Sequence, residues 1–159
     1  MSKICRTILI TLCAIVIAIG STACKNNESD SNAMYGDWQF CGVVEKGAEY
    51  AEENIITGDE FLDTFGADEM PDSGVSVDKE GIKGIFDNVP GTEVGEVEQI
   101  NDTQFRQPVK IKMMDGKKLD EPVEIDIYVT LKGKYLFVES TYVEDEYDSG
   151  NVNVYKRAE

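Results

Sequence analysis

Val123 to Leu131 reads V-E-I-D-I-Y-V-T-L, with an apolar side chain at every odd-numbered position. Because successive side chains on a β-strand point to opposite faces, this alternation predicts a strand with one dry and one wet face. A strand of this kind buries its apolar face only when other elements pack beside it. We therefore expect this segment to be the central strand of a sheet, with partners on both sides.

The segment before the central strand, residues 103–114, is expected to be one partner. Its apolar residues alternate with basic ones, so the apolar faces of the two strands can be aligned. Opposite charges directly across a strand pair add about 0.2 to 1 kcal/mol. The alignment predicts two such pairs, Lys112 with Glu124 and Lys110 with Asp126.

The segment after the central strand is expected to be the second partner. Lys132-Gly133 is predicted to form a tight hairpin turn, which places Leu136 opposite Val129. The same register sets Glu139 against Asp126, a like-charge pair.

The other segments extend the same β pattern. Gly and Pro turns separate short alternating runs, and only the stretch near residues 46–66 is rich in helix formers. There Phe61, Leu62 and Phe65 form one apolar stripe followed by Gly66, which predicts a short helix with a glycine C-cap that covers the sheet like a lid. We expect a mainly β fold: an antiparallel up-and-down barrel of about eight strands, with one or two short helices near residues 46–66. The further strands are expected at residues 36–44, 75–78, 81–87, 93–100 (with a bulge) and 152–157.

The amino terminus is typical of an export signal. A short basic start is followed by an apolar core at residues 8–19, which is too short to span a bilayer comfortably. The core ends in Gly20-Ser21-Thr22-Ala23-Cys24, which resembles the lipobox of bacterial lipoproteins. The resemblance implies that Cys24 receives a diacylglycerol and becomes the mature amino terminus. Ser21-Thr22-Ala23 also fits ordinary signal peptidase, and that alternative predicts a secreted, soluble protein.

These features predict the domain organisation. Residues 1–23 are the lipoprotein signal peptide, residues 24–33 a lipid-anchored flexible tether without large apolar side chains, and residues 34–159 the folded domain. The expected location is the cell membrane, with the domain on the extracytoplasmic side. After export Cys41 is the one cysteine besides Cys24, so no disulfide framework is expected, and Cys41 is interpreted as a small buried apolar residue.

Composition excludes several function classes. The chain carries a formal charge of −16, and without the signal peptide 13 basic residues face 31 acidic ones, a charge of −18. Such a surface repels phosphate backbones, so nucleic acid is not an expected partner. The absence of histidine removes Ser-His-Asp and Cys-His catalysis. No phosphate-binding loop, dinucleotide fingerprint or nucleophile elbow is present, and no carboxylate cluster has EF-hand spacing, so we expect no enzyme, no cofactor and no metal site.

Gly36-x-Trp38 at the start of the first strand, a meander of hairpins, and Lys156-Arg157 at the end of the last strand resemble the lipocalin-like domains of small bacterial lipoproteins. The resemblance implies that Trp38 packs across one end of a barrel and that Arg157 covers its ring as a cation–π pair.

Two functions are compatible with these patterns. The first is a tethered, non-catalytic module that binds a small apolar or amphipathic ligand inside the barrel. The second is a surface lipoprotein with a filled core that recognises another protein through its loops, for instance residues 114–122 or 144–150. Barrels of about eight strands can be either hollow or filled. The expected pocket lining is the inward row Ile125, Ile127, Val129, Leu136 and Val138.

Overall fold

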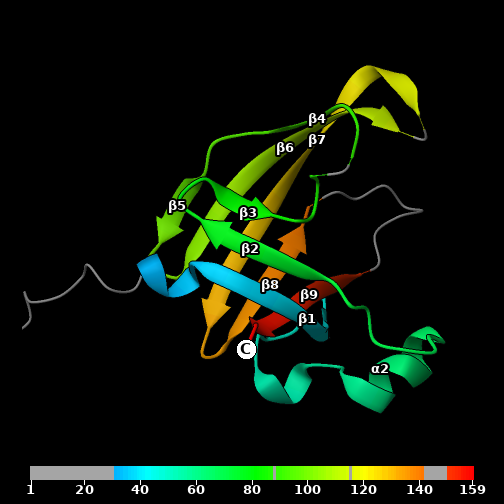
Figure 1. The fold of residues 1–159 in the computed structure, drawn as a ribbon, viewed down its shortest axis with the longest axis vertical. Coiled ribbons are helices and arrows are strands. Elements are labelled where there is room, and N and C mark those ends of the chain that lie inside the picture. Colours follow the sequence, from blue (N-terminus) through cyan, green and yellow to red (C-terminus); the bar gives the residue numbers. More distant parts are fainter. Residues whose placement is uncertain (1–30, 88, 115, 142–149) are drawn as a thin grey trace, which may run out of the picture. The chain divides into compact units, whose positions relative to one another are not determined.

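The computed structural model describes residues 31–87, 89–114, 116–141 and 150–159 (Figure 1). Their main feature is a sheet of nine strands, all paired antiparallel. The strands are β1 (Gly36–Glu45), β2 (Gly74–Asp78), β3 (Gly81–Lys83), β4 (Thr92–Val94), β5 (Glu98–Asn101), β6 (Gln104–Met114), β7 (Lys117–Lys132), β8 (Tyr135–Ser140) and β9 (Asn151–Arg157).

The sheet is strongly curled into a half-barrel, so that β2 and β3 cross over β6 and β7 (Figure 1). Its strand order is β3-β2-β1-β9-β8-β7-β6-β4, with β5 also paired to β6. The predicted mainly β, antiparallel architecture is therefore confirmed. One strand was expected over residues 93–100, but the structure has two, because the ladder along β6 is interrupted near Gly95 and Pro108. Pro108 lacks an N–H, and its carbonyl faces this gap and accepts a hydrogen bond from the Gly95 N–H (2.8 Å).

The central strand lies in β7 with its odd-numbered side chains inward, as predicted. Its registers are each two residues away from the expected ones: Ile111, not Met113, lies opposite Val123, and Val138, not Leu136, lies opposite Val129. An even shift preserves which side chains face inward. On the β8 side the shift arises because the turn is Gly133-Lys134, with φ 61° at Gly133 in its first position, a conformation that glycine adopts freely.

The cross-strand charge pairs change with the register. Lys110 pairs with Glu124 (2.7 Å), and Asp126 receives Arg106 (2.8 Å), so both predicted lysine pairings are wrong. The predicted clash of Glu139 with Asp126 is also wrong, because Glu139 lies opposite Tyr128.

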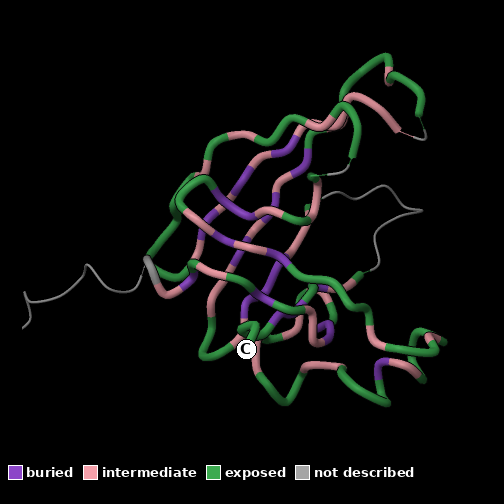
Figure 2. The backbone as a smooth tube through the Cα atoms, in the orientation of Figure 1, coloured by how far each residue is buried: buried purple, intermediate pink, exposed green. Residues whose placement is uncertain are grey.

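Two buried clusters lie on opposite faces of the sheet, and Figure 2 shows the buried stretches alternating along the strands. The inner cluster fills the half-barrel. The outer cluster lies on β1, β8 and β9 beneath residues 48–55. Residues 46–54, which are rich in helix formers, contain only a 3-10 turn at Glu52–Asn54. The inner cluster comprises Met34, Trp38, Val75, Val77, Ile82, Phe105, Val109, Ile125, Ile127, Val129, Leu136, Val138 and Tyr155.

Gln107 on β6 forms hydrogen bonds to the β2–β3 hairpin and to the segment between β4 and β5. Its side chain is 2% exposed; Oε1 accepts the Ile82 N–H (3.0 Å), and Nε2 donates to the carbonyls of Glu80 (3.0 Å) and Gly95 (3.1 Å). A Cβ at Gly81 would lie 2.2 Å from this amide, which explains the glycine at that position. Two of these three hydrogen bonds hold the β2–β3 hairpin against β6, and the third holds the segment at Gly95, between β4 and β5.

The helix predicted after Gly58 is present as α2 (Gly58–Phe65). Gly66 caps it in the left-handed conformation (φ 62°, ψ 33°), as expected from the sequence. Phe61 is its buried residue and anchors the helix to the sheet. Across the described ranges, no helix combines the length and apolarity needed to cross a membrane.

Candidate functional site

Trp38 and Arg157 lie together at one end of the half-barrel. They are directly opposite each other on β1 and β9, and the guanidinium carbon of Arg157 lies 4.3 Å from the centre of the indole ring. Arg157 also donates hydrogen bonds to the carbonyls of Tyr35 and Ala33, and the indole N–H donates to the carbonyl of Met34 (2.9 Å). Arg157 therefore covers the indole ring of Trp38 as a cation–π pair.

Gly36 explains why the first strand carries Gly-x-Trp. Its φ is +126°, which favours glycine, and a Cβ at this position would lie 2.3 Å from a guanidinium nitrogen of Arg157. The glycine thus leaves the space in which Arg157 reaches over Trp38. Gly36 and Trp38, the two defined residues of the Gly-x-Trp motif, therefore both lie beside Arg157 on the last strand.

The predicted pocket row lies in the packed interior of the half-barrel. Its side chains are at most 5% exposed and belong to the inner cluster with Trp38, Val75 and Val77. Of the row, Ile125 alone lines a hollow described below. The row therefore supports the second sequence-based reading, in which the core is filled, more than the first. The row comprises Ile125, Ile127, Val129, Leu136 and Val138.

A separate hollow of about 310 Å³, here called the aromatic pocket, lies between α2, β1 and β9. Four aromatic side chains contribute to its wall: Phe40 from β1, Phe61 and Phe65 from α2, and Tyr155 from β9. The local sequence explains this arrangement, because Phe40 and Tyr155 are cross-strand partners and the i, i+4 spacing places both α2 rings on one helix face. The remaining lining residues are Val43, Pro71, Ser73, Asn151 and Asn153.

Phe40 meets two of the other rings of the aromatic pocket nearly at right angles, and Phe61 and Phe65 are tilted by 38°. Phe40 lies 5.7 Å from Phe61 at an interplanar angle of 72°, and 5.8 Å from Tyr155 at 81°. Phe61 and Phe65 are 4.7 Å apart, and Phe65 is 43% exposed. Edge-to-face contacts of this kind stabilise aromatic clusters by about 0.5 to 1.5 kcal/mol per pair beyond their burial. The ring set is therefore fixed, with Phe65 at its open side.

Tyr155 is the most buried of the polar residues that line this pocket. Its side chain is 5% exposed, and burial raises the pKa of its hydroxyl to about 12, so it is a neutral phenol at physiological pH. No described residue forms a hydrogen bond with this hydroxyl. Thr92 Oγ1 is the only fully enclosed side-chain polar atom without a partner among the described residues, so the Tyr155 oxygen reaches open space. The aromatic pocket is the hollow that Tyr155 lines.

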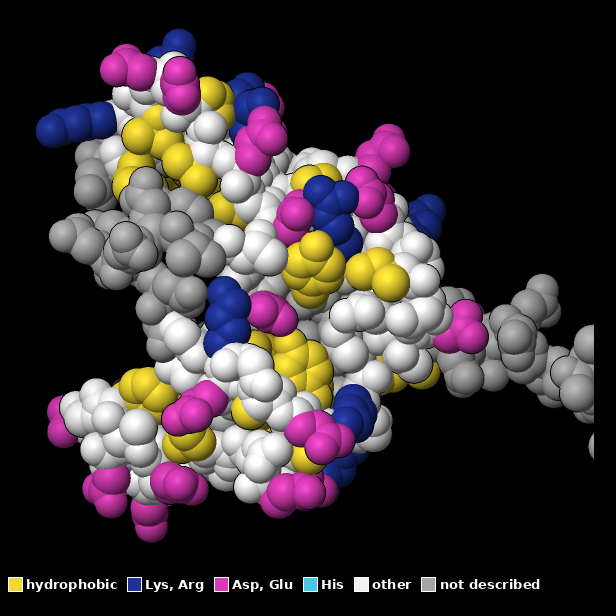
Figure 3. All heavy atoms as spheres, turned by 180° about the vertical axis from the view of Figure 1, so that it is seen from behind, with side chains coloured by type: hydrophobic (Ala, Val, Ile, Leu, Met, Phe, Trp, Pro, Cys, Tyr) yellow, Lys and Arg dark blue, Asp and Glu magenta, His cyan; other side chains and the backbone are white. Residues whose placement is uncertain are grey.

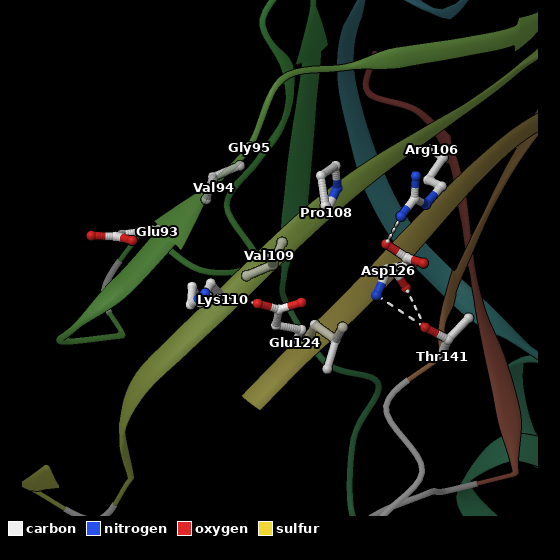
Figure 4. Close-up of a pocket in the computed structure, with 11 residues that line it drawn as sticks. Glu93, Val94, Gly95, Arg106, Pro108, Val109, Lys110, Glu124, Asp126 and Thr141 are labelled. Atoms are coloured by element: carbon white, nitrogen blue, oxygen red, sulfur yellow. Dashed lines mark hydrogen bonds and ion pairs between the residues drawn. The ribbon is translucent and has the colours of Figure 1, made fainter. Parts of the chain in front are cut away.

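A larger hollow, about 500 Å³, lies along β4, β6 and β7 and is called the charged groove (Figure 4). Its ionic groups already bind one another: Lys110 binds Glu124, and Arg106 binds Asp126, whose backbone N–H and carbonyl in turn bind Thr141. A charged ligand would compete with these pairs, whereas the described residues that line the aromatic pocket carry no charge. The aromatic pocket is therefore the better candidate site.

Phe137, on the outer face of the sheet, is covered by residue Tyr50. Tyr50 stacks on Phe137 with ring centres 4.5 Å apart, and its hydroxyl donates to Glu139 (2.8 Å). Cys41 is half-buried in the same cluster, and burial raises the pKa of its thiol, which keeps it protonated and unreactive.

Other predicted features fall partly outside the described residues. Cys24 and residues 144–149 of the predicted recognition loop lie there. Among the residues that the structure does describe, no three cysteine, aspartate or glutamate side chains gather closely enough to hold a metal ion.

Part of the aromatic pocket was visible in the sequence pattern. Phe40 shares its strand parity with Trp38, and Phe61 and Phe65 form the helix stripe. Only the pairing of β1 with β9, which joins residues far apart in the chain, brings Tyr155 to them.

Comparisons of the chain with protein-family models, with curated proteins and with solved structures found no match.

Proposed function

We propose that the protein is a membrane-anchored extracytoplasmic lipoprotein that binds a small apolar or amphipathic ligand without transforming it. The observation that carries the proposal is the aromatic pocket, which four aromatic residues line, one of them a buried tyrosine whose hydroxyl has no described partner. Small-molecule sites are concave, mostly apolar, and hold a few polar groups that orient the ligand. The Trp38–Arg157 pair supports the lipocalin-like assignment.

The location of the site differs from the sequence-based hypothesis. The ligand would lie between α2 and the strand pair β1–β9, and not along the inward row of β7 and β8, whose side chains fill the core. The filled core also keeps the second function open: a surface lipoprotein that recognises a protein partner through its loops.

Ligand binding can be tested by native mass spectrometry of the full chain purified from its host. Ser73 is an exposed residue at the pocket wall, so Ser73→Trp is expected to fill the pocket and abolish the retained small molecule. Thr64→Trp, on an exposed α2 position that does not line the pocket, is the matched control and should keep the ligand. A mass without any adduct in the wild-type protein would favour the protein-recognition function.

The membrane anchor can be tested at Cys24. The full chain is expected to fractionate with membranes and to show the mass of a diacylglycerol on Cys24, because two acyl chains suffice for stable retention. Cys24→Ser should move the protein to the soluble fraction, and globomycin should block maturation. Unmodified mature protein in the culture medium would instead support the secreted alternative.

A further inference from the structure

Residues 58–73 supply one side of the aromatic pocket, and their charge is uniformly negative. Phe61, Phe65, Pro71 and Ser73 line the pocket. The same segment contains six acidic residues and no lysine or arginine. Acidic side chains are visible over α2 at the lower left of Figure 3. The acidic residues are Asp59, Glu60, Asp63, Asp68, Glu69 and Asp72.

These six carboxylates are not neutralised locally. None of them forms an ion pair with a described residue, whereas on the sheet Glu93, Glu98, Glu124 and Asp126 are each held by a lysine or arginine. A cluster of uncompensated charge beside a concave, low-dielectric wall raises the local concentration of counter-ions. The potential at the mouth of the aromatic pocket therefore favours cations and opposes anions.

The pocket wall has the chemistry that accommodates an organic cation. The described lining residues include four aromatic rings and no charged group. Ring faces attract cations, and alkylammonium groups lose little hydration when they enter such a site. Phe40 stands nearly perpendicular to both Phe61 and Tyr155, and all three rings line the hollow. The hydroxyl of Tyr155 can bind a polar group carried by the same ligand.

We propose that the aromatic pocket selects organic cations with a trialkylammonium group over neutral and anionic molecules of the same shape. This inference rests on the proposed function and specifies the chemistry of its ligand. The aromatic rings hold the ammonium group, and the acidic segment 58–73 steers it to the pocket.

Three molecules of nearly the same shape provide the test: choline, its neutral isostere 3,3-dimethylbutan-1-ol, and the anion 3,3-dimethylbutanoate. Binding is measured by ligand-detected NMR titration of the full chain in phosphatidylethanolamine nanodiscs, with empty nanodiscs as the blank. Choline is expected to bind roughly three- to thirtyfold more tightly than the alcohol, the range of a cation–π contribution, and the anion most weakly. Salt should weaken choline binding and leave alcohol binding unchanged.

Two variants separate the contributions of the rings and of the acidic segment. Phe65→Leu keeps an apolar side chain but removes a ring, so it should weaken choline binding roughly threefold and alcohol binding much less. Tyr128→Leu, on β7 outside the pocket, is its control. Asp59→Asn with Asp63→Asn should weaken choline binding at low salt only, and Asp120→Asn with Glu121→Gln, two exposed acids on β7, should have no effect.

The outcomes distinguish this inference from the proposed function. Equal binding of choline and the alcohol, with Ser73→Trp abolishing both, would overturn cation selection and leave the pocket as a binding site. If none of the three molecules binds and the protein from its host carries no adduct, both proposals fail.

Discussion

Gln107→Leu is expected to lower the free energy of unfolding by about 3 kcal/mol, since leaving a buried hydrogen-bonding group without a partner costs about 1 to 3 kcal/mol. The substitution removes one accepted and two donated hydrogen bonds, and it leaves the Ile82 N–H and the carbonyls of Glu80 and Gly95 without their present partner. Leucine fills similar space, so the loss reports the polar contacts and not a cavity. Urea unfolding followed by far-UV circular dichroism measures the change.

Gln104→Leu is the matched control for this prediction. Gln104 lies on the same strand, and its side chain donates one half-buried hydrogen bond to Thr130 Oγ1 (3.0 Å). Its replacement is expected to cost less than about 1 kcal/mol. Equal losses in the two variants would show that Gln107 does not fasten the β2–β3 hairpin to β6.

Trp38→Ala is expected to lower the free energy of unfolding by about 3 to 5 kcal/mol, the usual cost of truncating a large buried aromatic side chain. Trp38 is 2% exposed, donates a hydrogen bond to Met34 and carries Arg157 over its ring, so the variant loses a packed ring and both contacts. Thermal unfolding by circular dichroism is the appropriate measurement.

Two comparisons separate the contribution of the ring from that of its neighbours. Tyr35→Ala, at a side chain 38% exposed, should cost less than about 1 kcal/mol, as surface substitutions usually do. Arg157→Ala should cost an intermediate amount and shift the emission of the single tryptophan to the red, because the ring loses its cover. An Arg157→Ala variant with unchanged emission would contradict the stacked geometry in solution.

The sequence predicted the parity of the strands better than their register. Alternation in Val123–Leu131 identified the inward side chains, because parity depends only on neighbouring residues. Register depends on the turns. Gly133 occupies the first turn position and not the second, which moves β8 by two residues. On the other side, an irregularity in the ladder between Ile111 and Met113 sets the register of β6, so that Ile111 lies opposite Val123.

The candidate site was less predictable than the fold. Each ring of the aromatic pocket could be assigned to a strand or helix, but the sequence did not show that β1 pairs with β9 or that α2 packs beside them. The interior row was predicted correctly as inward-facing. Whether inward side chains leave a hollow depends on the curl of the whole sheet, and here Gln107 and the crossing β2–β3 hairpin bring the walls together.

The place of β9 in the strand order has a consequence for biosynthesis. Trp38 and Arg157 are 119 residues apart in the chain yet face each other, and β9 joins the half of the sheet that ends in β3 to the half that ends in β4. A ribosome makes this connecting strand last, so the sheet stays incomplete until residue 157 has been synthesised. Pairings this distant also form slowly. On the proposed export route, the nascent polypeptide would therefore stay unfolded long enough to be threaded through a translocation channel.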